Sequence, residues 1–80
     1  MSQYSHKFVE DYDGPVGFGF DREIDEATVK VYLQKFSDDE LMEKLIPLLT
    51  DEELEGIFEL ISELLAKHLN KEDYQRLFVK

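Results

Sequence analysis

The sequence predicts an all-α protein, a small bundle of about four short helices behind an extended N-terminal arm. A helix-start pattern occurs four times after residue 23: Asp, Ser, Thr or Asn, with a second polar residue three positions later. Such side chains cap helices because the first four amide groups of a helix have no partner within it. In addition, apolar residues recur at helical spacing over residues 51–68. With 80 residues, the chain has the length of a single domain.

Residues 1–23 are expected to form an extended or partly disordered arm. Three of the four glycines of the chain lie here, and glycine weakens a helix because it loses the most backbone freedom on folding. The arm also carries Phe18 and Phe20. We expect these two rings to anchor it, either across a groove of its own bundle or on a partner.

The first helix is predicted over residues 26–35, with Asp25 as its N-cap. Here the pattern is ambiguous, because apolar residues within 28–36 recur both at helical spacing and in strand-like alternation. The alternative is an α+β fold in which 28–36 pairs with 15–20 as a hairpin. The helix is favoured because the start pattern of the later helices is already present at residue 24.

The second helix is predicted over residues 38–46. Ser37 and Glu40 have the spacing of a capping box, in which each side chain accepts a hydrogen bond from the other residue's amide. Pro47 should end this helix because its ring and its missing N–H group oppose continuation.

The third helix, over residues 51–68, is predicted to organise a single helical domain that spans residues 24–80. Thr50 and Glu53 form a second capping box. At about 100° per residue, half of the helix circumference is apolar, wide enough to contact more than one neighbouring helix. This half consists of Leu54, Ile57, Phe58, Leu60, Ile61, Leu64 and Leu65, and Leu69 continues it directly after the helix.

The fourth helix is predicted over residues 71–78, with Asn70 as its N-cap. The apolar residues of the second and fourth helices are expected to pack against the third. Among them, Leu77 and Phe78 lie close to the end of the sequence and are candidates for contact with a partner.

The charge is strongly negative, with 19 Asp and Glu residues against nine Lys and Arg, for a net charge of −10. Direct binding to nucleic acid is disfavoured because such binding depends on clustered Lys and Arg. An anionic membrane surface should also repel the chain. Many of the acids lie in first turns of predicted helices, where they suit the helix dipole. Four others define a candidate acidic face: Glu43, Glu55, Glu59 and Glu63.

The sequence offers little support for catalysis. There is no Cys, and we identify no nucleophile motif, phosphate-binding loop or dinucleotide-binding spacing. The two histidines, His6 and His68, are far apart in sequence and have no Cys near them, so they make a poor zinc site. We therefore expect no enzyme activity, no catalytic residue, no cofactor and no bound metal.

The predicted function is a non-catalytic protein–protein interaction module or small regulatory subunit in the cytoplasm. Its partner is expected to be another protein or a second copy of the chain as a homodimer, with no direct contact to nucleic acid or membrane. The candidate contact residues are Phe18, Phe20, Leu77 and Phe78. The alternative function is an acidic DNA mimic, whose face of glutamates blocks a nucleic-acid-binding protein.

Overall fold

The computed structural model describes residues 6–19 and 21–80. In this part of the chain all regular secondary structure is helical, with no strand. The predicted all-α class is therefore confirmed. The alternative hairpin between 15–20 and 28–36 is wrong, because residues 28–36 belong to a continuous helix.

By the density of its internal contacts, the chain divides into two compact units between Leu48 and Leu49. The first unit contains α1 (Lys7–Asp11), α2 (Arg22–Phe36), α3 (Asp39–Leu45) and the short 3₁₀ turn η1 (Ile46–Leu48). The second contains α4 (Asp51–His68), α5 (Lys71–Asp73) and the π-helix η2 (Tyr74–Val79). The division expected from the sequence, an arm over 1–23 and one helical domain over 24–80, stays a prediction.

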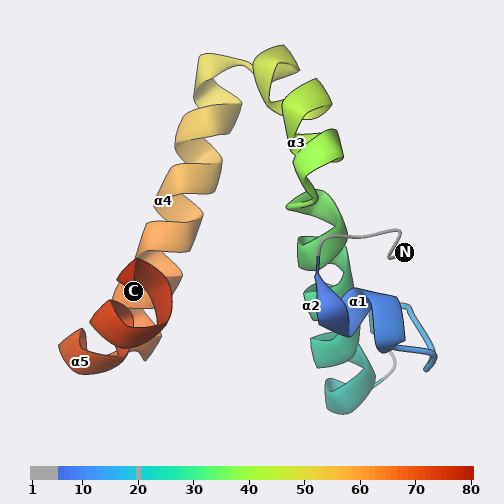
Figure 1. The fold of residues 1–80 in the computed structure, drawn as a ribbon. Helices are drawn as coiled ribbons and strands as arrows, with labels where there is room; N and C mark the ends of the chain where they lie inside the picture. Colours follow the sequence, from blue (N-terminus) through green and yellow to red (C-terminus); the bar gives the residue numbers. More distant parts are fainter. Residues whose placement is uncertain (1–5, 20) are drawn as a thin grey trace. The chain divides into compact units, whose positions relative to one another are not determined.

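In the first unit, α1 packs against α2 (Figure 1). The side chains buried in the described chain are Val9 of α1 and Thr28 and Val31 of α2. The core thus lies between these two helices. The α1 helix differs from the extended arm expected here, since the glycines that oppose a helix all follow residue 13.

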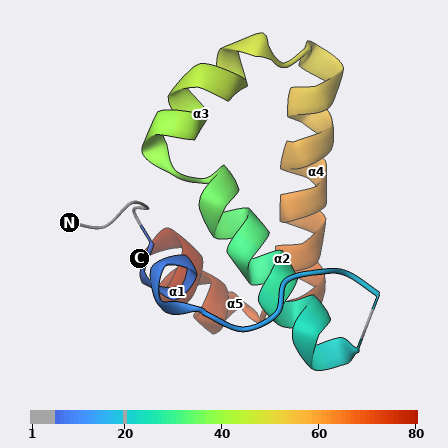
Figure 2. The same ribbon diagram turned by 90° about the vertical axis from the view of Figure 1, so that its right-hand side faces the viewer.

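Beyond α1, the chain runs back along α2 (Figure 2). Hydrogen bonds join residues 6–19 to α2 and to its C-cap residue Ser37 in antiparallel order: His6 Nε2 with Ser37 Oγ (2.7 Å), Val9 N–H to Gln34 Oε1 (2.8 Å), Gly17 N–H to Thr28 Oγ1 (2.9 Å) and Gly19 N–H to Asp25 Oδ1 (2.8 Å). Thr28 also donates to the Gly17 carbonyl oxygen, at 3.0 Å. Polar groups therefore hold this segment, whereas the Phe18 side chain, expected as an anchor, is exposed.

The caps of α2 and α3 differ from those expected. Asp21, rather than Asp25, caps α2 by accepting from the Ile24 amide at 2.9 Å, so this helix begins earlier than predicted. Asp38, rather than Ser37, caps α3. The predicted Ser37–Glu40 capping box is wrong because the Ser37 hydroxyl bonds to His6 and to the Gln34 carbonyl oxygen instead.

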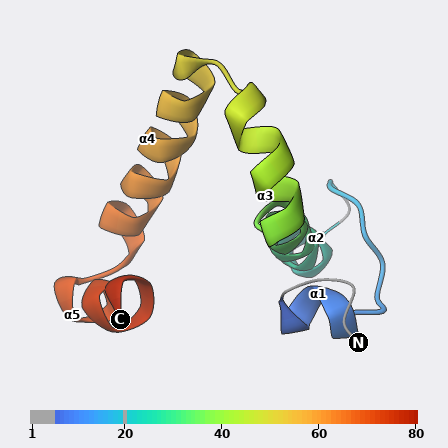
Figure 3. The ribbon, with the colours of Figure 1, turned by 45° about the horizontal axis from the view of Figure 1, so that its top comes forward.

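In the second unit, α4 has the predicted bounds, and its capping box is confirmed. The Glu53 amide donates to Thr50 Oγ1 at 3.1 Å, and the Thr50 amide donates to Glu53 Oε1 at 2.9 Å. After α4 the chain turns into α5 and η2 (Figure 3). Asn70 caps this last segment as predicted, accepting from the Asp73 amide at 2.8 Å. No side chain within residues 49–80 is buried.

Candidate functional site

An apolar patch surrounds Phe18 in the first unit. The Phe18 side chain is 72% exposed and borders a shallow pocket with Val29 and Leu33 of α2, which are also exposed. We call these three residues the Phe18 patch. Four charged side chains complete the lining of the pocket: Arg22, Asp25, Glu26 and Lys30.

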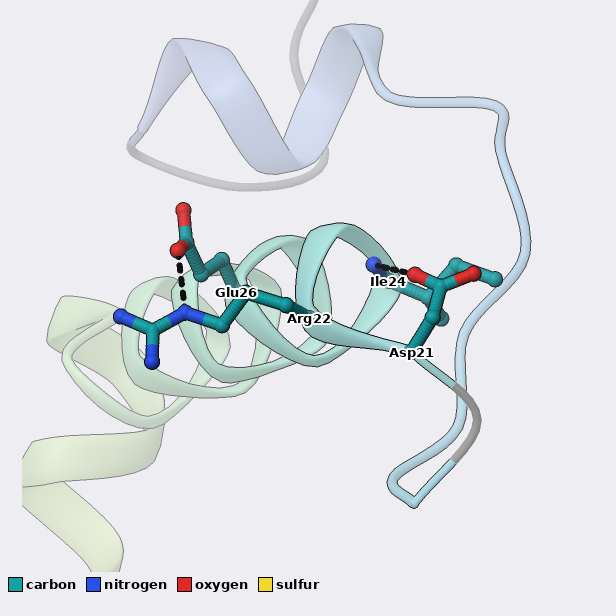
Figure 4. Close-up of polar contacts among 4 residues, drawn as sticks. All are labelled: Asp21, Arg22, Ile24 and Glu26. Carbon is teal, nitrogen blue, oxygen red and sulfur yellow. Dashed lines mark hydrogen bonds and ion pairs between the residues drawn. The ribbon is translucent and has the colours of Figure 1, made fainter.

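Three of these charged residues belong to the first two turns of α2, and Lys30 follows in the third. Figure 4 shows Arg22 and Glu26. Arg22 and Glu26 form an ion pair at the spacing of one helical turn, with the Arg22 Nε–H donating to Glu26 Oε2. The hydrogen bond and the negative charge of Glu26 raise the pKa of the Arg22 guanidinium above its ordinary value. Because both side chains are exposed, the pair adds little to stability. Its charges remain accessible to a partner that contacts the patch.

The other predicted contact residues do not gather around Phe18. Phe20 lies outside the described residues. Leu77 and Phe78 belong to η2 in the second unit, where both are exposed. The Phe78 ring stacks on Tyr74, with 5.4 Å between the ring centroids, and together they line a groove with the side of α4 formed by Phe58, Ile61 and Leu65.

In the second unit, one face of α4 carries a row of apolar side chains that are mostly exposed. Ile57 is half-buried, and the other members are exposed, among them Phe58 at 71%. We call this the α4 apolar face; its members are Leu54, Ile57, Phe58, Leu60, Ile61 and Leu64. The sequence predicted this stripe as the centre of a bundle, but within residues 49–80 it has no buried side chain.

The four residues of the predicted acidic face separate into two sets. Glu43 is exposed on α3 in the first unit. Glu55, Glu59 and Glu63 are exposed on α4 and recur every four residues, so they form a row along one side of that helix. The structure thus brings together three of the four glutamates.

Over 6–19 and 21–80, no group of three or more His, Cys, Asp and Glu side chains is arranged to hold a metal ion. None of the helices in this part of the chain combines the length and apolarity needed to cross a membrane. No protein-family model, curated protein or solved structure matches the chain.

The sequence did not identify Val29 and Leu33 as candidate contact residues. They recur at helical spacing with Tyr32, a pattern typical of a face turned toward a core. In the structure the adjoining side of α2, with Thr28 and Val31, is buried and this face is exposed. The periodicity identified an apolar face but not whether the chain itself covers it.

Proposed function

We propose that this chain is a non-catalytic protein–protein interaction module, acting as a small regulatory subunit in the cytoplasm. The observation that carries the proposal is the Phe18 patch, with exposed apolar side chains beside accessible charges. Exposed apolar patches rimmed by polar residues are typical of surfaces that bind other proteins. The absence of Cys fits a reducing compartment.

Capture of proteins from cell extract on the immobilised chain tests this function. We expect a defined protein to be retained both at about 0.05 M and at about 1 M salt, because an apolar contact is not screened by ions. Phe18→Ser and Leu33→Ser should each abolish retention. The matched control is Val16→Ser, since Val16 is exposed on the same segment but does not line the pocket.

Two results would contradict the proposal: no protein retained at the higher salt concentration, or retention that Phe18→Ser and Leu33→Ser leave unchanged. Purified partner and titration with each variant would then give the loss of affinity. A buried aromatic side chain at the centre of an interface typically contributes at least about 2 kcal/mol. Phe18→Ser should therefore weaken binding about 30-fold or more.

The acidic row of α4 supports a second candidate, a DNA-mimic inhibitor of a nucleic-acid-binding protein. Like charges four residues apart destabilise a helix by a few tenths of a kcal/mol. Glu59 and Glu63 lie beyond the first turn of α4, so the helix cap does not account for them. This candidate predicts that the chain captures a nucleic-acid-binding protein only at low salt and that DNA competes for the same protein. Replacing Glu55, Glu59 and Glu63 with Gln should abolish both the capture and the competition.

A further inference from the structure

The α4 apolar face has the residue spacing of a helix-pairing seam. Leu54, Ile57, Ile61 and Leu64 alternate at steps of three and four residues, which is the repeat that packs one helix along another. Glu53 and Lys67 lie along one edge of this seam, near its two ends. The seam is thus apolar along its length and oppositely charged at its two ends.

The second unit also lacks the packing that normally stabilises a helix of this length. Most helical stability in proteins comes from burying an apolar face, yet no side chain of residues 49–80 is buried. Covering the α4 apolar face would supply this missing contribution. The remaining question is which surface covers it.

Charge is distributed unevenly along this unit. Residues 51–63 contain no Lys or Arg and carry the acids Asp51, Glu52, Glu53, Glu55, Glu59 and Glu63. Residues 64–80 carry the bases Lys67, Lys71, Arg76 and Lys80, against the acids Glu72 and Asp73. A second α4 in the parallel orientation would align like charges. Within α4, Lys67 is the one Lys or Arg. An antiparallel second α4 brings this Lys67 toward the acidic N-terminal end of the first helix and also opposes the two helix dipoles.

One antiparallel register satisfies both the seam and the charges. When Leu54 faces Leu64 of a second copy, Ile57 faces Ile61 of that copy, and the two-fold axis repeats both layers. The same register brings Glu53 beside Lys67 of the second copy, once at each end. All apolar layers of the seam are then filled.

We propose that the α4 apolar face binds α4 of a second copy of this chain, in an antiparallel two-fold dimer. The inference deepens the proposed interaction function and rests on it, by naming one partner and the surface that binds it. The Phe18 patch belongs to the other unit and is not used, so the two proposals make separate predictions.

Disulfide trapping tests the orientation, and the absence of Cys from the natural sequence makes every crosslink assignable. Leu54→Cys and Leu64→Cys proteins are mixed in a glutathione redox buffer. We expect the mixed 54–64 disulfide to predominate over the two homodimers. In the antiparallel dimer, like positions lie about 15 Å apart along the axis, beyond the Cα separation that a disulfide allows. The matched control is Glu59→Cys, on the opposite side of α4, which should form no disulfide with itself or with either of the other two variants.

Sedimentation equilibrium measures the strength of association. The natural chain should dimerise with increasing concentration, and Ile61→Lys should be monomeric while Glu59→Lys dimerises. Lys67→Glu should weaken the dimer about 2- to 30-fold, because symmetry places two Glu53 contacts in each dimer. Adding Glu53→Gln should recover part of this loss, since Gln also serves in a capping box.

Three outcomes would overturn the dimer. Efficient crosslinking of Leu54→Cys to itself would show a parallel pair. A monomer at all concentrations would show that residues 22–48 of the same chain, or another protein, cover α4. Dimerisation unaffected by Ile61→Lys would place the contact elsewhere. In each case, loss of partner capture on Phe18→Ser would still support the proposed function, and Phe18→Ser should leave the dimer intact.

Discussion

Replacing Thr28 with Val should release the segment around Gly17 from α2. The Thr28 hydroxyl accepts from the Gly17 amide and donates to the Gly17 carbonyl oxygen, and the Thr28 side chain is 5% exposed. Val has nearly the same shape as Thr but cannot make either hydrogen bond. Helix propensities of the two residues are similar, so α2 itself should persist.

The size of the effect follows from the polar groups left behind. An unsatisfied buried amide costs about 1–3 kcal/mol, and Gly17 is only half-buried, so we expect about 1–2 kcal/mol. The opening of this segment should become about 5- to 30-fold more frequent. Gly19 should open less, because the hydrogen bond of its amide to Asp25 is kept in this variant.

Amide hydrogen exchange measured by NMR gives the opening free energy at each residue. In Thr28→Val, protection of the Gly17 amide should fall by the factor above and that of the Gly19 amide by less, while amides of α4 keep theirs. Thr28→Ser is the matched control, because it retains the hydroxyl and loses only a methyl group. If Thr28→Ser lowers the exchange protection of the Gly17 amide more than Thr28→Val does, packing of the Thr28 methyl group holds the segment. The hydrogen-bond argument is then refuted.

Two caps can be tested in the same way. Thr50→Ala should destabilise α4 by about 1 kcal/mol and reduce the helical circular dichroism signal, since α4 has no buried side chain to compensate. Thr50→Ser keeps the capping hydroxyl and should retain the signal. If Thr50→Ala and Thr50→Ser lose the same amount of signal, the side-chain cap is not what stabilises the helix. Asp21→Ala should lower the protection of the Ile24 amide by a similar free energy, whereas Asp21→Asn, which keeps the accepting oxygen, should not. If Asp21→Asn also lowers the protection of the Ile24 amide, the negative charge of Asp21 stabilises the helix start, and the hydrogen bond to its side-chain oxygen does not.

The parts of the fold that the sequence predicted are those held by local interactions. The capping box of Thr50 and Glu53 and the cap at Asn70 each join residues three positions apart. Their geometry is complete once a helix starts, whatever surrounds it. The bounds of α4 follow from such a cap and from a long apolar repeat, and the sequence contains both.

Where two residues could cap the same helix, contacts elsewhere in the fold determine which of them does so. Ser37 and Asp38 are both suitable caps for α3 by sequence, but His6 binds the Ser37 hydroxyl across 31 positions of the chain. Asp25 likewise receives the Gly19 amide, and Asp21 caps α2. No local pattern contains this information, because it depends on the path of residues 6–19 along α2.

The same path decides which apolar residues are available for function. Residue spacing shows that α2 and α4 each have an apolar face, but spacing is the same for a face that is buried and one that is exposed. On α2, packing of α1 and bonding of Gly17 to Thr28 bury the side with Thr28 and Val31. Val29 and Leu33 are left exposed, and both line the pocket that Phe18 borders. The bounds of α4 and the caps at Thr50 and Asn70 could thus be predicted from the sequence, because they arise from neighbouring residues. The exposed patch could not be, because it is the surface left over after segments far apart in the chain have packed.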